Sequence, residues 1–309
     1  MVNILITKTK QEKMTSKKID INELTPYTKI RINEKEGRTY QETQEIIYRL
    51  YIQTLRKPTT LIISIIQPLL WLVMFGALFQ NAPIYLFGNY NIEYQDFLNS
   101  GIIIFTAFNS AVNAGLTIVF DREFGFLNKI LISPIANKNS IMYACITHTW
   151  TITMIQVLVI AGIKYYDYKI CKSINLIHLL ISLIVISTII TTVSNISIYS
   201  AFILPGHIEF IALTSLFLNL PTLFTSTALA PLSFMPRWLQ VLCCINPLTY
   251  GIEIIRSITL DSSFTMKKQI INTLLMPING YRALTILLMI NIASFLLVKT
   301  IIQYKYDKN

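Results

Sequence analysis

The sequence predicts an all-α integral membrane protein with six transmembrane helices, and three observations support that prediction. Only 14% of the 309 residues are charged, whereas globular domains have about 25%. The mean hydropathy is high, at +0.54. The apolar residues form runs of about 20 or more, enough to cross a hydrocarbon core of roughly 30 Å at 1.5 Å per residue. Helices are the predicted conformation because lipid cannot hydrogen-bond to open backbone groups.

The N-terminal part of the chain is predicted to lie outside the membrane. Residues 1–38 are polar, mixed in charge and aperiodic, which is typical of a flexible tail. Residues 39–57 are predicted to form an amphipathic helix at the membrane interface. Thr39 and Glu42 make the T-x-x-E pattern of a capping box at its start, and Pro58 follows its end. A secretory signal peptide is not predicted, because this part contains no long apolar core.

Six spans and their connections make up the rest of the chain. The transmembrane domain is predicted to cover residues 58–302, followed by a short tail at 303–309. Its spans are predicted at 59–80, 98–119, 141–163, 174–198, 208–230 and 282–302. Prolines interrupt the half-apolar stretch 231–281, so re-entrant or interfacial helices on the outer side are predicted there.

The distribution of Lys and Arg predicts that both termini face the inner compartment. In that orientation 18 of the 26 Lys and Arg residues lie on the inner side, 12 of them in the first 57 residues. The first outer loop contains none, although it follows this strongly basic flank. Membrane orientation therefore explains the net charge of +10, and nucleic-acid binding is not predicted.

A short charged segment at residues 120–134 connects the second and third spans. Its apolar residues recur at i, i+4, i+7 and i+11, the spacing of one helix face, and are Phe120, Phe124, Leu127 and Leu131. Its charged residues lie largely elsewhere on the helix and are Asp121, Arg122, Glu123 and Lys129. The pattern predicts an amphipathic helix that contacts a soluble partner at the membrane surface. The alternative is a solvated interfacial helix without a partner.

Few residues suggest catalysis or metal binding. The four cysteines contain no C-x-x-C pattern, and the three histidines are scattered. His148 and His178 lie inside predicted spans, where a neutral imidazole hydrogen-bonded between helices is the favoured interpretation. The small residues Ala107, Ala111 and Gly115 favour close helix packing within the subunit over dimerisation. No Gly is followed by Lys, so the chain lacks the G-x-x-x-x-G-K-[ST] loop that binds ATP phosphates.

Three patches, taken in order, resemble the ABC-2 family of transporter membrane subunits, and its plastid-encoded members in particular. The first patch is Gln67-Pro68-Leu69-Leu70-Trp71 with Phe75-Gly76, and the second is the charged segment ending in Ser133-Pro134. The third patch contains Pro221 through Pro231, Met235-Pro236-Arg237-Trp238-Leu239-Gln240, Asn246-Pro247-Leu248-Thr249-Tyr250 and Arg256. The resemblance covers about residues 40–302. The chain departs from the family pattern at Phe126, Asn128 and Thr227.

The resemblance implies a transporter driven by ATP, with the nucleotide-hydrolysing engine on a separate chain. One transporter would contain two ABC ATPase subunits and two membrane subunits, the second being another copy of this chain. This chain would not be an enzyme by itself and would bind no cofactor, because ATP and Mg belong to the partner ATPase. The implied ATPase-coupling helix contains Asp121, Arg122, Glu123, Phe124, Gly125, Leu127, Lys129, Leu131 and Pro134. The implied outer re-entrant motif contains Pro221, Pro231, Pro236, Asn246, Pro247, Tyr250 and Arg256.

Other functions stay open at the level of the residues. A secondary transporter or channel and a membrane assembly factor would each work in the lipid bilayer without an ATPase partner. The predicted spans contain no Asp, Lys or Arg well inside, which disfavours coupling to an ion relay. A membrane enzyme would need convergent His, Asp or Glu residues, for which there is little support. The expected direction is export, and the expected location is a plastid membrane or else a bacterial inner membrane.

Overall fold

The computed structural model describes residues 37–79, 94–132, 139–168, 176–203, 219–260, 265–272 and 277–306. In these residues five helices are long and apolar enough to cross a membrane: Pro58–Leu78, Tyr94–Glu123, Asn139–Gly162, Leu176–Ile203 and Gly280–Tyr304. Helices Arg237–Ile245 and Pro247–Leu260 together meet the same criterion but join at a bend of 89°, so they form either a broken span or a re-entrant pair. The prediction of a multi-span helical membrane protein is confirmed.

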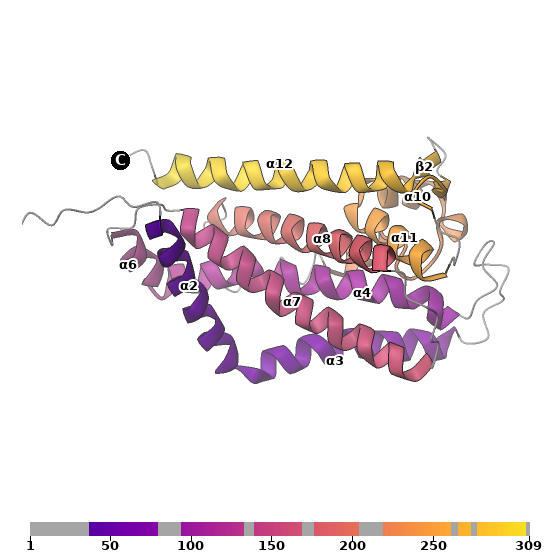
Figure 1. The fold of residues 1–309 in the computed structure, drawn as a ribbon, viewed down its shortest axis with the longest axis horizontal. Helices are drawn as coiled ribbons and strands as arrows, with labels where there is room; N and C mark the ends of the chain where they lie inside the picture. The colour runs from indigo at the N-terminus through magenta and orange to yellow at the C-terminus, as the bar shows by residue number, and fades with distance from the viewer. Residues whose placement is uncertain are drawn as a thin grey trace, which may run out of the picture. The chain divides into compact units, whose positions relative to one another are not determined.

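The elements run from α2 to α12 along the chain. They are α2 (Gly37–Leu55), α3 (Pro58–Leu78), α4 (Tyr94–Val112), α5 (Ala114–Glu123), α6 (Phe126–Ile132), α7 (Asn139–Tyr168), α8 (Leu176–Ile203), η3 (Leu232–Phe234), α10 (Arg237–Ile245), α11 (Pro247–Leu260), β1 (Gln269–Asn272), β2 (Pro277–Asn279) and α12 (Gly280–Tyr306). In Figure 1 the helices α4, α7, α8 and α12 run beside one another. Helices α2 and α6 lie near one end of them, and α10, α11 and β2 near the other.

Helix α8 lies at the centre of the packing, in contact with α4, α5, α7, α11 and α12. One core cluster joins α4, α8 and α11, and a second joins α5, α6, α7, α8 and α12 at the end near α2. Helix α3 differs, because it buries only Pro68 and Leu72. The apolar face that α3 leaves exposed is available to lipid or to another chain.

Helix α2 begins at Gly37, two residues earlier than predicted. Thr39 therefore lies inside the helix, where its carbonyl accepts a hydrogen bond from the Thr43 hydroxyl at 2.7 Å. The predicted capping box of Thr39 and Glu42 is wrong, because a capping residue must precede the helix. Residues 1–36 of the predicted tail lie outside the described residues.

Helix α2 packs along α7 through polar as well as apolar contacts. The Tyr51 and Thr151 hydroxyls are hydrogen-bonded to each other, and the Thr54 hydroxyl lies 2.9 Å from Nε2 of His148. The Tyr51 ring also meets the His148 ring edge to face. The interpretation of His148 as a residue hydrogen-bonded between helices is therefore confirmed.

The second span is longer than predicted and is broken at Asn113. Ser197 of α8 bridges the break: its Oγ accepts a hydrogen bond from the Gly115 N–H at 2.9 Å and donates one to the Val112 carbonyl. This satisfies backbone groups that the break removes from the helical ladder. A Cβ at Gly115 would overlap the Ser197 carbonyl, so only glycine allows this approach. The small residues thus pack inside the subunit, as predicted.

Three C-terminal expectations need correction. The predicted span 208–230 lies partly outside the described residues, and its described end is helical only through residue 224 before turns begin. There the Thr225 and Ser226 hydroxyls donate to nearby carbonyls and compete with the helical ladder. The stretch 231–281 includes the antiparallel pair β1–β2 as well as helices. Helix α12 continues to Tyr306, so most of the predicted tail at 303–309 is helical.

Candidate functional site

The charged segment is two helices joined by a sharp turn, so the prediction of one continuous helix is wrong. Helix α5 ends at Glu123, and α6 begins at Phe126. Gly125 between them has φ of 71°, a left-handed conformation that glycine adopts at little cost. We call residues 121–132 the elbow. The side chain of Leu131 and all of Pro134 lie outside what the structure describes.

The turn separates residues that the sequence placed on one face. Phe124 is 77% exposed, whereas Leu127 is 2% exposed and packs into the core cluster beside α2, α7 and α8. Of these two apolar side chains, Leu127 is therefore the one that anchors the elbow in the core of its own chain. Phe124 stacks on Phe120, and both rings remain accessible.

Two arginines fix the elbow to neighbouring helices. The Arg122 guanidinium donates a hydrogen bond to the Ala201 carbonyl of α8 at 3.0 Å. Arg49 of α2 forms a partly buried ion pair with Asp121, and its guanidinium carbon lies 3.9 Å from the centre of the Phe126 ring. Hydrogen bonds to charged groups contribute roughly 1.5–3 kcal/mol each. The elbow is thus held to α2 and α8 at once.

The outer surface of the elbow combines opposite charges with an aromatic ring. Glu123, Phe124, Asn128 and Lys129 are exposed there. An exposed aromatic residue supplies contact area, and flanking charges of opposite sign fix the orientation of a partner. The surface has the composition of a protein-binding patch. It has no paired carboxylates and no histidine that would suggest catalysis.

Arg49 is a site residue that the sequence did not reveal. It lies in the predicted interfacial helix, 72 residues before its partner Asp121. No local sequence pattern connects Arg49 to the elbow. Its position on the predicted interfacial helix was the only indication that it could contact this segment.

A second group of predicted residues is assembled at the other end of the helices, around Arg256 of α11. Its guanidinium donates a hydrogen bond to the Thr227 carbonyl at 2.6 Å and pairs with Glu253 one turn earlier. It also lies over the Phe97 ring of α4, with 3.6 Å between the guanidinium carbon and the ring centre. Arg256 is only 1% exposed, so it serves as an internal crosslink.

Asn246 joins the same region at the bend between α10 and α11. Its amide nitrogen donates to the carbonyls of Thr222 and Thr225, both at 3.1 Å. Its side-chain oxygen accepts the Leu248 N–H at 3.0 Å, which caps the first turn of α11. The Tyr250 hydroxyl donates to the Cys244 carbonyl across the bend.

The prolines of this motif lie at or next to the ends of its helices. Pro247 occupies the first position of α11, and Pro236 precedes α10. Pro231 precedes the short helix η3, and the Pro221 carbonyl accepts the Thr225 N–H at 2.8 Å. The structure therefore gathers the predicted residues of this motif into one compact cap, here called the polar cap, formed by residues 221–256.

Between the elbow and the polar cap, side-chain amides form hydrogen bonds with one another. The Asn219 side chain donates to the Asn109 side-chain oxygen at 2.7 Å, and Asn109 reaches Gln67 of α3 at 3.5 Å. Within the described ranges no group of three or more His, Cys, Asp or Glu could hold a metal ion.

Comparison with known proteins adds to this geometry. The ABC-2 type transporter family matches residues 41–260. A protein named "Putative transport permease ycf38" from Porphyra purpurea is 41% identical over 294 residues, which cover 94% of this chain and 98% of the relative. Proteins of the same name from Cyanophora paradoxa and Pyropia yezoensis are 41% and 46% identical and cover 85% and 75% of this chain and 89% and 78% of their own lengths. These relatives are encoded in plastid genomes of algae.

Proposed function

Because the chain belongs to the ABC-2 type transporter family, we propose that it couples ATP hydrolysis on a separate subunit to the export of a substrate. Family membership makes it a membrane subunit of an ABC transporter, and its relatives place it in a plastid membrane. The direction of transport and the coupling route are the parts that we propose.

The energy source in this proposal is a partner chain. ATP and Mg would bind to an ABC ATPase, because this sequence has no G-x-x-x-x-G-K-[ST] loop with which to hold phosphates. This chain would supply the membrane path and a surface that senses the ATPase. It would not act as an enzyme by itself.

The proposal rests on the elbow, whose exposed surface carries an aromatic ring, Phe124, between charged residues of opposite sign. Phe124 would enter a groove on the ATPase, while Glu123 and Lys129 would set its orientation. Motion of the ATPase would then pass directly into the membrane, since α5 is the end of the second span. The Arg49–Asp121 pair would carry the same motion to α2 and then to α3, which follows α2 in the chain.

A second copy of the chain would complete the membrane path. Helix α3 leaves an apolar face uncovered that includes Ile63, Leu70, Val73 and Met74. We place the contact between the two copies on this face, with the exit route beside it. The polar cap would act as a re-entrant structure on the outer side, held rigid by Asn246 and Arg256.

The elbow is tested by changing its exposed ring. Phe124→Ser should reduce recovery of the ABC ATPase with the purified complex by at least about tenfold, since an anchoring aromatic residue at an interface contributes 2 kcal/mol or more and each 1.4 kcal/mol is a factor of ten in affinity. Phe234→Ser is the matched control, because Phe234 is a similarly exposed ring in η3 at the opposite end. The measurement is quantitative mass spectrometry of the complex in mild detergent.

Equal ATPase recovery with the two variants would contradict the proposed role of the elbow. If the unmodified chain brings down no ATPase at all, the second candidate, a secondary transporter or channel, would replace the proposal. Transport in vesicles without ATP would then be the direct measurement.

A further inference from the structure

One side-chain amide lies on the uncovered face of α3, far from both ends of the helix. Gln67 is the tenth of the 21 residues of α3, so it lies about 15 Å from either end at 1.5 Å per residue. The residue is exposed, although its neighbours on this face are apolar. At this depth a membrane consists of acyl chains, which offer no hydrogen bond to a polar group.

Hydrogen bonds inside the subunit orient this amide. The Asn219 side chain donates to Oδ1 of Asn109 at 2.7 Å, so the amide nitrogen of Asn109 is turned toward Gln67. That nitrogen donates to Oε1 of Gln67 over a long distance of 3.5 Å. Nε2 of Gln67 is therefore the donor at the end of this chain of amides. It has no hydrogen-bond partner within the described parts of the chain.

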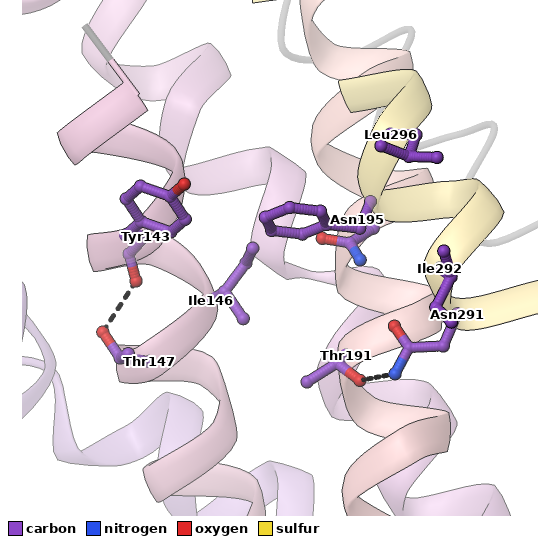
Figure 2. Close-up of a pocket in the computed structure, with 9 residues that line it drawn as sticks. Tyr143, Ile146, Thr147, Thr191, Asn195, Asn291, Ile292 and Leu296 are labelled. Carbon is purple, nitrogen blue, oxygen red and sulfur yellow. Dashed lines mark hydrogen bonds between the residues drawn. The ribbon is translucent and has the colours of Figure 1, made fainter. Parts of the chain in front are cut away.

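Two other amides within the spans donate to acceptors of their own chain. Asn291 of α12 donates to the Thr191 hydroxyl of α8 at 2.8 Å, as Figure 2 shows. Asn195 of α8 donates in the other direction, to the Ser294 hydroxyl of α12 at 3.3 Å. A donor on the uncovered face of a span has no such neighbour, and leaving it unsatisfied in lipid is costly. Gln67 therefore needs an acceptor from another molecule.

The residues around this amide favour a second helix as the source of the acceptor. Ile63, Gln67, Leu70 and Met74 recur at i, i+4, i+7 and i+11, which places them on one face of α3. All four residues are exposed. An apolar stripe that contains one amide is suited to helix pairing in lipid, because the stripe packs and the amide forms a hydrogen bond across the contact.

A second copy of the chain carries the matching group. Near a two-fold axis a residue meets its own counterpart, and an amide has both a donor and an acceptor. Nε2 of one Gln67 then donates to Oε1 of the other, and the reverse bond forms at the same time. Each oxygen keeps a second lone pair for Asn109. Both exposed donors are satisfied in this way without any further chemical group.

We propose that the Gln67 side chains of two copies form a reciprocal pair of hydrogen bonds at the middle of the membrane and thereby set the register of the two α3 helices. A single polar position in an apolar contact excludes shifted registers, because a shift leaves both amides in apolar surroundings. This inference rests on the proposed contact between two copies through α3 and adds the residue that aligns them.

Thiol–disulfide equilibrium in vesicles tests the pair. The complete chain carries Met74→Cys as a reporter, with its four native cysteines replaced by alanine, and the disulfide-linked fraction is measured in a glutathione redox buffer. Gln67→Leu should lower the dimerisation constant roughly eightfold, since two hydrogen bonds between transmembrane helices contribute about 0.6 kcal/mol each. Gln156→Leu is the matched control. The Gln156 amide donates to the Ser64 hydroxyl of α3 at 2.8 Å inside the subunit, so its loss should leave the constant unchanged.

A second variant shows whether the two side chains meet. Gln67→Cys, without the reporter, should itself form disulfide-linked dimers. If Gln67→Leu leaves the dimerisation constant unchanged or raises it, the pair is overturned while the contact through α3 stands. An unchanged constant with altered ATP hydrolysis by the complex would assign the amide to the transport path instead. If the Met74→Cys chain forms no disulfide-linked dimers, both the pair and the proposed contact through α3 are overturned.

Discussion

At the scale of single residues, Arg256 shows how a charge is retained in an apolar protein. Burying an unpaired guanidinium is very costly, so every buried arginine needs compensation. Here Glu253 supplies the opposite charge, the Thr227 carbonyl accepts a hydrogen bond, and the Phe97 ring lies against the guanidinium. The same side chain thereby connects α11, α4 and the turn before η3.

Arg256→Met should therefore lower the midpoint of thermal unfolding in detergent by about 5–10 °C. Removing one partner of a buried pair costs about 3–5 kcal/mol, because Glu253 keeps its charge without compensation. Arg282→Met is the control, since Arg282 is exposed and donates to the Pro277 carbonyl at 3.3 Å. Similar midpoints for the two variants would show that Arg256 is not an internal crosslink.

At the scale of elements, the elbow shows how one glycine redirects a helix. Without the left-handed turn at Gly125, α5 would continue along its axis and carry Phe126 and Leu127 away from Arg49 and the core. With the turn, Leu127 returns to the core while Phe124 stays exposed. The elbow therefore has one buried side and one exposed side.

Gly125→Ala tests this turn without a steric complication, since nothing lies within 4 Å of an added Cβ. The left-handed conformation costs a residue with a side chain roughly 1–2 kcal/mol, so amide hydrogen exchange across residues 121–132 should become faster. Gly162→Ala in α7 has equally open space and no positive φ, and it should leave exchange in the elbow unchanged. Slower or unchanged exchange in Gly125→Ala would contradict the assigned role of the turn.

At the scale of the whole molecule, burial is unequal among the spans. Helix α8 contacts five other helices and buries 12 of its 28 residues, whereas α3 buries two of its 21. Both helices are highly apolar, so hydropathy alone does not separate them. In the proposed transporter the face of α3 meets a second copy, while α12 faces lipid.

Site-directed crosslinking checks that arrangement. With the four native cysteines replaced by alanine, Met74→Cys on α3 should form disulfide-linked dimers in the membrane. Met289→Cys on α12 should not, although the two methionines are 66% and 71% exposed. Disulfide-linked dimers formed through α12 instead of α3 would contradict the proposed contact between the two copies.

The sequence by itself determined the membrane class, the approximate positions of five of the six predicted spans and the presence of a charged segment between the second and third of them. These properties depend on the composition of consecutive residues, because the length of an apolar run decides whether it can cross a bilayer. The missing phosphate loop is also a local pattern. The main residues of the polar cap were grouped in advance only through the resemblance to the ABC-2 family.

Only the tertiary structure decided how distant residues meet. The Arg49–Asp121 pair, the Ser197 bridge across the break at Asn113, and the Asn195–Ser294 hydrogen bond all join helices that are far apart in sequence. A hydropathy pattern cannot specify these contacts, because lipid and a neighbouring helix are equally apolar. Close packing and the need to satisfy buried polar groups select one arrangement, and those requirements act between helices.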